Sequence, residues 1–280
     1  MIIWIASYPK SGNTWVRSII SSMLYSNDGV FNFNLLKKIK QFPNKKYFVN
    51  FTKDFQNINE IKKYWIESQD WINLNKETKF FKTHHINCKI GQHAFTNKSN
   101  TLGTIYVVRD PRNLVNSFTN HYNIDKNTAK HFITSQHSVT GALGKMKKDN
   151  NIFTILGSWS DHYKSWTKMN NNLLLIKYED LLLNPLIEIN KIIKYLKNLI
   201  NFNCEEEKIK NIINSTSFEI MKREEDEKGF HEAVMDDTGL NKVNFFNLGK
   251  DNKWGKYLNS EEEKYIREKL GDEMKELGYI

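Results

Sequence analysis

The sequence has few of the residues that hold small secreted or metal-stabilised folds together. Its 280 residues include two cysteines, Cys88 and Cys204, far apart in the chain. Two cysteines so placed give neither a disulfide framework nor a thiolate metal site, and they predict a reducing compartment. Prolines number four, and we find no linker rich in proline or serine and no internal repeat. We therefore expect one domain over residues 1–280.

Long apolar runs are also missing. The N-terminal apolar run covers residues 1–6, and no basic residue precedes it. We therefore expect no signal peptide. Since a membrane-spanning helix needs about 20 consecutive apolar residues, we expect no membrane segment and no membrane partner. A cytoplasmic location fits these absences.

The charge is positive but dispersed. Lys and Arg number 41 against 32 Asp and Glu, which gives a formal net charge of +9. This charge suits a polyanionic partner such as nucleic acid, an anionic membrane or a nucleotide. No arginine-rich or nuclear-localisation run is present, so we expect no nucleic-acid partner. A composition of 39% hydrophobic and 26% charged residues excludes wholesale disorder.

Strands and helices alternate along the chain. The run Ile2 to Ile5 predicts a strand buried on both faces, and a turn and a helix with an apolar stripe follow it. Further strands are expected at 79–85, 103–110 and 173–180, the last entering a short helix. Helical stripes cover 189–199 and 266–277. This order predicts an α/β fold with a central parallel β-sheet flanked by helices on both faces.

Two segments have weak periodicity. Residues 223–253 have mixed charge and three glycines, and we expect them to form a mobile loop over a site. Residues 123–150 are a second candidate for a mobile or lid-forming segment.

The turn after the first strand has the chemistry of an anion site. Lys10, Ser11, Gly12 and Thr14 supply a cation, two hydroxyls and a flexible backbone just before a helix N-terminus. It is not a Walker A loop, because there the lysine follows the second glycine. The turn therefore predicts a phosphate site that needs no metal, with a plain turn carrying a solvated lysine as the alternative.

The segment from Tyr8 to Trp15 resembles the 5′-phosphosulfate loop of the cytosolic-type sulfotransferases. These enzymes use 3′-phosphoadenosine 5′-phosphosulfate (PAPS) and release its desulfonated product, PAP. Four more segments match the family's motifs in the family's order: residues 82–84, 108–117, 178–180 and 216–218. The matches cover nearly the whole chain, and the resemblance implies the P-loop NTPase-like fold of this family.

The resemblance implies a role for each matched residue. Lys10 contacts the 5′-phosphate and stabilises the leaving group, Lys82 orients the sulfonate, and His84 takes the proton of a small-molecule acceptor. It also implies PAPS as co-substrate, with no metal. The implied nucleotide-binding residues are Lys10, Ser11, Gly12, Asn13 and Thr14 in the loop, Arg109 and Ser117 at the 3′-phosphate, Trp15 and Phe218 on the two faces of the adenine, Tyr178 and Thr216 at its edge, and Gly249 and Lys250 near the C-terminus.

The C-terminal signature departs from the family's pattern. Where the family has two basic residues before a glycine, this chain has Asn247 and Leu248 before Gly249. Neither can supply a charge-assisted contact. Either Lys250 takes over the 3′-phosphate or the affinity for PAPS is weaker. The family's dimerisation signature is also absent, which leaves the oligomeric state open.

Three other interpretations remain open at this stage. The residues His84, His85, Cys88 and His93 together could ligate a metal, although their spacing matches no common zinc pattern. A P-loop-type small-molecule kinase would share the strand–loop–helix start, but it needs a Walker A lysine and an acidic magnesium ligand. A non-catalytic nucleotide- or RNA-binding module would use the positive charge without needing a base at His84.

Overall fold

The computed structural model describes residues 1–139, 152–168, 172–235 and 242–280. Its centre is a five-stranded sheet with the order β2-β3-β1-β6-β7, in which every pair is parallel. This confirms the predicted α/β class with a central parallel sheet. The strands of this sheet are β1 (Ile2–Ser7), β2 (Lys40–Gln41), β3 (Lys79–Thr83), β6 (Thr101–Val108) and β7 (Leu173–Lys177).

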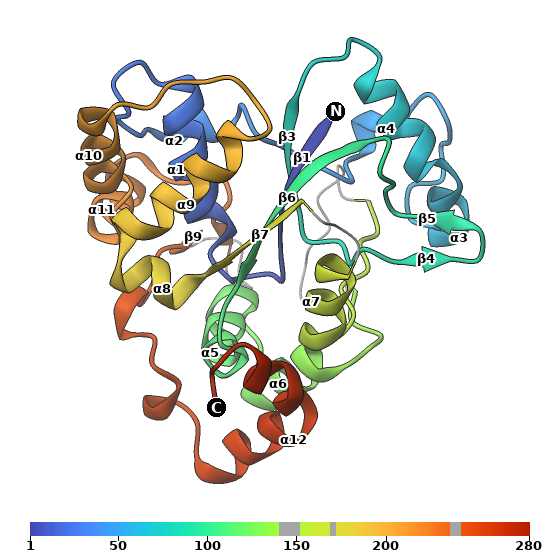
Figure 1. Cartoon of the computed structure of the whole chain (residues 1–280). Coiled ribbons are helices and arrows are strands. Elements are labelled where there is room, and N and C mark those ends of the chain that lie inside the picture. The colour runs from blue at the N-terminus through green and yellow to red at the C-terminus, as the bar shows by residue number, and fades with distance from the viewer. Residues whose placement is uncertain (140–151, 169–171, 236–241) are drawn as a thin grey trace.

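Helices cover both faces of the sheet, as Figure 1 shows. Strand β1 is wholly buried because alternate side chains enter the two faces: Ile3 and Ile5 join the core under α1, α9 and α10, whereas Trp4 joins the opposite core. The helices are α1 (Asn13–Tyr25), α2 (Phe33–Leu36), α3 (Ile58–Ile61), α4 (Trp65–Asn73), α5 (Pro111–Tyr122), α6 (Lys126–Thr134), α7 (Trp159–Thr167), α8 (Tyr178–Leu183), α9 (Pro185–Lys197), α10 (Glu206–Ser215), α11 (Phe218–Lys228) and α12 (Ser260–Glu276).

The short elements lie outside the main sheet. Two small antiparallel pairs join β4 (Lys89–Ile90) to β5 (His93–Ala94) and β8 (Val234–Met235) to β9 (Lys242–Val243). Single 3₁₀ turns complete the elements: η1 (Lys45–Tyr47), η2 (Lys62–Tyr64), η3 (Gly249–Asp251) and η4 (Trp254–Lys256).

The register of the central strands brings distant motifs to one edge. Ile5 pairs with Lys82 and Ala6 with Thr83, while Ser7 pairs with Val107 on the other side. Because parallel strands end at the same edge, the turn after β1 lies beside His84 and beside the segment after β6. This edge is where a ligand site is expected in an open α/β sheet.

The predicted loop at 223–253 is wrong for its first part. Helix α11 runs to Lys228 because one of its faces is buried: Met221 packs into a small aromatic core, and the Glu225 carboxylate accepts the backbone N–H groups of Phe245 and Phe246 at 2.8 Å each. Helix α6 likewise occupies part of the segment 123–150. The remainder of that segment from 140 onward, and residues 236–241, lie outside the described residues.

Strand β3 is shorter than the predicted segment 79–85, so His84 and His85 lie just beyond its end. Within the described residues, no helix is long and apolar enough to cross a membrane.

Candidate active site

The anion loop, residues 7–14, is held by bonds that its own side chains make. The Asn13 amide donates to the Ile5 carbonyl at 3.0 Å and to the Ser7 hydroxyl at 3.2 Å, which ties the start of α1 to the end of β1. Lys10 and Gly12 have positive φ values of 65° and 100°. The loop therefore turns tightly and directs the free N–H groups of the first turn of α1 toward one point.

Gly12 meets a second constraint, because a Cβ atom there would lie 2.7 Å from the Tyr178 ring. We expect Gly12→Ala to lower the melting temperature and to weaken the binding of phosphorylated nucleotides, since an αL conformation costs an alanine about 1–2 kcal/mol and the ring must also move. Thermal unfolding with and without PAP measures both effects. Gly91→Ala is the control, because Gly91 also has a positive φ but has nothing within 4 Å of the added atom. Equal losses in both variants would contradict the close packing at Gly12.

Arg109 reaches the anion loop from the end of β6. Its guanidinium donates to the Lys10 carbonyl at 3.3 Å and lies 4.0 Å from the centre of the Tyr178 ring. Its Nε atom and the Ser11 hydroxyl are buried, and neither has a hydrogen-bond partner within the described part of the chain. Two buried polar groups with unmet bonds beside one loop fit an anionic ligand.

The Lys10 side chain lies beneath an aromatic ring, with Nζ 3.9 Å from the centre of the Phe245 ring. Burial, together with the nearby Arg109 guanidinium, lowers the pKa of Lys10 to about 7. A lysine in this condition favours its charged form when a phosphate binds beside it.

Lys82 lies in β3 and His84 lies just beyond its end, and both are beside the loop. The His84 Nδ1 atom lies 2.8 Å from the Ser7 carbonyl oxygen and 3.3 Å from the Ser7 hydroxyl. A carbonyl oxygen can only accept, so Nδ1 carries the ring proton and the lone pair of the neutral ring lies on Nε2. Burial, with the Lys82 ammonium nearby, lowers the pKa of His84 to about 4, so the ring is neutral at pH 7.

Glu232 brings a carboxylate into this site from the segment before β8. It forms ion pairs with Arg17 at 2.8 Å and with Lys82 at 2.7 Å, and it accepts from the Thr14 hydroxyl at 3.2 Å. Burial would raise the pKa of Glu232, but the Arg17 and Lys82 charges hold it well below its usual range. A charged glutamate therefore lies between the loop and Lys82.

A cavity of about 230 Å³ adjoins the loop beside α1. Trp15, Thr216, Phe218 and Lys250, all predicted nucleotide-binding residues, line it together with apolar side chains of α1, α9 and α10. Tyr178 packs edge-on against Trp15, with ring centres 5.6 Å apart. The structure thus brings the predicted adenine residues together. The Thr216 hydroxyl already donates a hydrogen bond to the Ile212 carbonyl at 2.7 Å.

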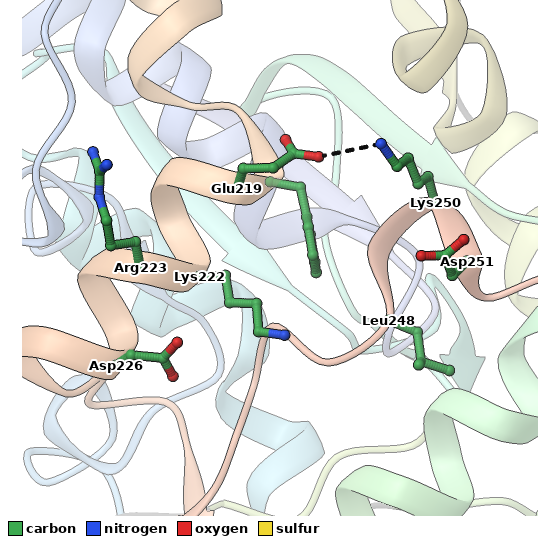
Figure 2. Close-up of a pocket in the computed structure, with 8 residues that line it drawn as sticks. Glu219, Lys222, Arg223, Asp226, Leu248, Lys250 and Asp251 are labelled. Carbon is green, nitrogen blue, oxygen red and sulfur yellow. Dashed lines mark ion pairs between the residues drawn. The ribbon is translucent and has the colours of Figure 1, made fainter.

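Lys250 lies opposite the start of α11, where its side chain faces Glu219 (Figure 2). A Cβ atom at Gly249 would lie 2.6 Å from the Phe218 ring, and φ there is 52°. Lys250 Nζ lies 3.7 Å from the Glu219 carboxylate and is mostly exposed. Leu248 lines a second cavity, of about 350 Å³, whose other lining residues are Phe218, Glu219, Lys222, Arg223, Asp226, Lys250 and Asp251.

Ser117 has partners of its own on α5. Its hydroxyl accepts from the Asn252 amide at 2.8 Å, and the same amide donates to the Asn113 carbonyl at 3.1 Å. Within the described part of the chain no hydrogen bond joins Ser117 to Arg109, so the two residues of the predicted 3′-phosphate pair belong to separate hydrogen-bond networks. Asn252 is a polar neighbour of Ser117 that sequence reasoning missed.

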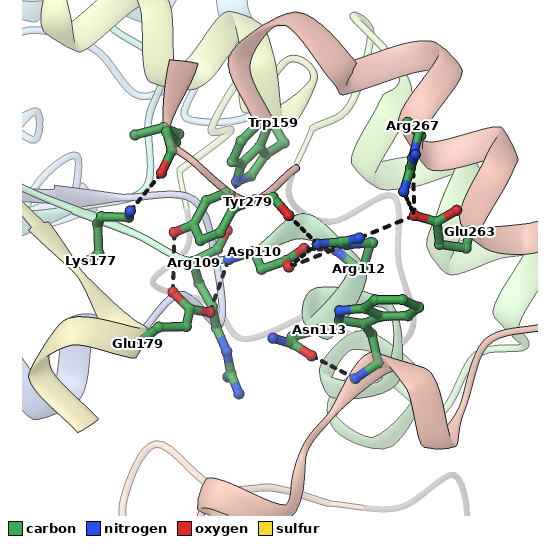
Figure 3. Close-up of polar contacts among 12 residues, drawn as sticks. Arg109, Asp110, Arg112, Asn113, Trp159, Lys177, Glu179, Glu263, Arg267 and Tyr279 are labelled. Carbon is green, nitrogen blue, oxygen red and sulfur yellow. Dashed lines mark hydrogen bonds and ion pairs between the residues drawn. The ribbon is translucent and has the colours of Figure 1, made fainter. Parts of the chain in front are cut away.

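The rest of the segment after β6 is held by ion pairs, as Figure 3 shows. Asp110 caps α5 and accepts from Arg112 at 2.7 Å, and Arg112 also pairs with Glu263 at 3.1 Å. Glu179 accepts from the Asp110 backbone at 3.1 Å and from the Tyr279 hydroxyl at 3.1 Å. These contacts fix the position from which Arg109 reaches the loop.

The histidine-rich segment does not form a metal site in the described chain. His85 stacks on Phe95 with ring centres 4.2 Å apart, and its Nδ1 atom bonds the Ile86 carbonyl at 2.6 Å. No three His, Cys, Asp or Glu side chains among the described residues are grouped so as to hold a metal ion.

The model of the sulfotransferase domain family matches residues 2–278. The chain belongs to the sulfotransferase family. Among its curated relatives, the luciferin sulfotransferase of Photinus pyralis is 27% identical over 79% of this chain, and sulfotransferase 1B1 of Canis lupus familiaris is 27% identical over 79%. This sulfotransferase chain spans 56% and 66% of the lengths of those two relatives.

A solved structure has the same sulfotransferase fold. Mouse sulfotransferase SULT7A1, crystallised with PAP, matches with a TM-score of 0.60 and 19% identity, over 98% of this chain and 84% of that one. The predicted membership of the family and the predicted P-loop-like fold are confirmed.

Two charged residues of this site were missed by sequence reasoning. Arg17 lies one helical turn after Thr14, in a stretch of α1 where Val16, Ile19 and Ile20 are buried. An arginine within an apolar helical stripe is a sequence pattern that could have indicated a buried charged residue at the site. Glu232 gave no comparable signal, because it lies in a segment of mixed charge 218 positions from Thr14.

Proposed function

We propose that this protein transfers the sulfonate group of PAPS to a hydroxyl or amine of a small-molecule acceptor. The observation that carries the proposal is the meeting of the anion loop with Lys82 and His84 at the carboxyl edge of β1 and β3. Group transfer of this kind depends on in-line placement and on cations that neutralise the leaving oxygen.

The residues present fit a doubly phosphorylated nucleotide. Ser11 and Arg109 offer buried, unpartnered polar atoms beside the loop, and Trp15 and Phe218 line the adjoining cavity. We propose that the loop residues, Lys10 to Thr14, hold the 5′-phosphate, and that Arg109 and Ser117 hold the 3′-phosphate. PAPS supplies a sulfonate attached through oxygen to its 5′-phosphate.

The chain's own groups would act as follows. Lys10 and Lys82 neutralise the charge that develops on the leaving oxygen and on the sulfonate. His84 Nε2 takes the acceptor's proton while the new O–S or N–S bond forms and the bond from sulfur to the phosphate oxygen breaks. The Ser7 carbonyl holds the ring in the tautomer that this step requires.

The kinase interpretation needs a free acidic magnesium ligand at the end of a strand. Asp110 is the carboxylate that follows β6, and Arg112 and the backbone at the start of α5 occupy it. The binding-module interpretation gives no reason for a neutral His84 held near the Lys82 ammonium. Both interpretations are therefore less well supported than sulfonate transfer.

A substitution at Asn247 tests whether the 3′-phosphate site lacks a basic contact at this position. We expect Asn247→Arg to tighten PAP binding by about tenfold, since a hydrogen bond to a charged group contributes about 1.5–3 kcal/mol. Asn198→Arg is the matched control, because Asn198 ends α9 near Tyr195, which bonds Asn172 at the opposite edge of the sheet. Calorimetric titration measures both. Equal gains in the two variants would show a general charge effect and contradict a site at Asn247.

The acceptor is identified by incubating the protein with labelled PAPS and a metabolite extract, and then finding the compound that gains the label. We expect labelled product only when the extract is present, and none with Lys10→Ala. PAP binding without transfer to any compound would favour a binding module.

A further inference from the structure

Arg17 and Glu232 form a charged pair that no step of the proposed transfer uses. The Arg17 side chain is 2% exposed, and its Nη2 atom donates to both Glu232 oxygens, at 2.8 and 2.9 Å, and to the Thr14 hydroxyl at 3.1 Å. Its Nε atom is buried without a partner in the described chain. A guanidinium so deeply buried is costly unless an anion faces it.

The Glu232 carboxylate is that anion, and it lies where the anion loop meets Lys82. Thr14 belongs to the anion loop, and Lys82 stands two residues before His84 at the end of β3. All three donors, Arg17, Lys82 and Thr14, bind the two oxygens of this one carboxylate. A carboxylate and a sulfonate are both compact anions that accept hydrogen bonds through oxygen, so both suit the same donors.

Glu232 lies in a connecting segment of the fold, outside the central sheet. Its neighbour His231 is half exposed, and the segment that carries Glu232 connects α11 to the short strand β8 rather than forming part of the central sheet. Arg17, by contrast, is fixed in the middle of α1. The cation is therefore rigidly placed, whereas its counter-ion comes from a peripheral segment.

We propose that Arg17 is a further residue that binds the sulfonate of PAPS. Glu232 occupies the position of the sulfonate as the counter-ion of Arg17, and the incoming sulfonate displaces it. This inference rests on the proposed function. It predicts a difference between the two nucleotides: PAPS competes with Glu232, whereas PAP, which has no sulfonate, does not. After transfer, the returning carboxylate re-pairs Arg17 and Lys82.

The test compares PAPS and PAP affinities, without acceptor, in two single variants. We expect Glu232→Gln to tighten PAPS binding roughly tenfold, because a neutral amide competes less with the sulfonate. We expect Arg17→Gln to weaken PAPS binding and to lower kcat/KM roughly tenfold or more, because a charge-assisted bond is lost. PAP affinity should change less than twofold in both variants, which also shows that the nucleotide site is folded.

Two further variants make the outcome decisive. Glu60→Gln removes a carboxylate that pairs with Lys63 on the surface, and it should leave PAPS affinity unchanged. If a single variant fails to fold, the double variant Arg17→Gln with Glu232→Gln removes both charges together, and the two opposite effects on PAPS affinity should then nearly cancel. Unchanged or weaker PAPS binding in Glu232→Gln, with PAP still bound, would overturn this inference. Wild-type protein that binds neither nucleotide would overturn the proposed function instead.

Discussion

Replacing His84 by alanine is expected to lower kcat for sulfonate transfer by about 10²–10⁴-fold, the range that a positioned general base contributes. The reason is the geometry of the ring: Ser7 fixes the proton on Nδ1 at 2.8 Å, and burial keeps the ring neutral at pH 7. Without the ring, the acceptor's proton has no group placed to receive it beside the anion loop.

Binding measurements separate this loss from damage to the site. The PAP-induced rise in melting temperature should be retained in His84→Ala, because His84 is proposed to act on the acceptor and not on the nucleotide. His137→Ala is the control, since His137 lies exposed after α6. Unchanged transfer by His84→Ala, with the control also active, would remove His84 from the mechanism.

Acid is expected to unfold the protein well before pH 4. Burial is the main cause that lowers the pKa of four histidines: to about 4 for His84 and His85, to about 3 for His162 and to about 2 for His121. Between these values and the ordinary 6.5, the unfolded chain binds more protons than the folded one. The free energy of unfolding therefore falls as the pH drops below 6.5, by about 1.4 kcal/mol per pH unit for each histidine.

Four histidines titrating together would lower the free energy of unfolding by about 5 kcal/mol per pH unit. A typical protein has a free energy of unfolding of about 5–15 kcal/mol. Urea unfolding at several pH values below 6.5 measures this slope. His85→Gln should reduce it by about one proton, since the His85 ring is fully buried and its Nε2 atom has no partner within the described chain. A free energy of unfolding that stays level down to about pH 5 would contradict neutral burial of these rings.

The parts of the site that sequence reasoning predicted are those whose chemistry is local. The anion loop combines strand, glycine and helix start within eight residues, and the order of the strands then places Lys82 and His84 beside it. Strand β1 could be predicted from the continuous apolar run that includes Trp4, because a strand covered on both faces has no polar alternation.

The parts that sequence reasoning missed depend on contacts between distant segments. Helix α11 runs into the segment 223–253, which was predicted as a loop, because Glu225 binds two backbone N–H groups 20 and 21 positions away. Asn252 reaches Ser117 from 135 positions away, and Glu232 reaches Thr14 from 218. Local periodicity carries no information about such pairs, so they become visible only in the folded chain.

Calorimetric titration of the protein with PAP, and with 5′-AMP as the matched nucleotide that lacks the 3′-phosphate, tests the central claim most directly. We predict that PAP binds and that 5′-AMP binds at least about tenfold more weakly, because Arg109 and Ser117 would then have no phosphate to hold. Arg109→Ala should bring the two affinities together. No binding of PAP at millimolar concentration, or equal binding of both nucleotides by the wild-type protein, would contradict the account.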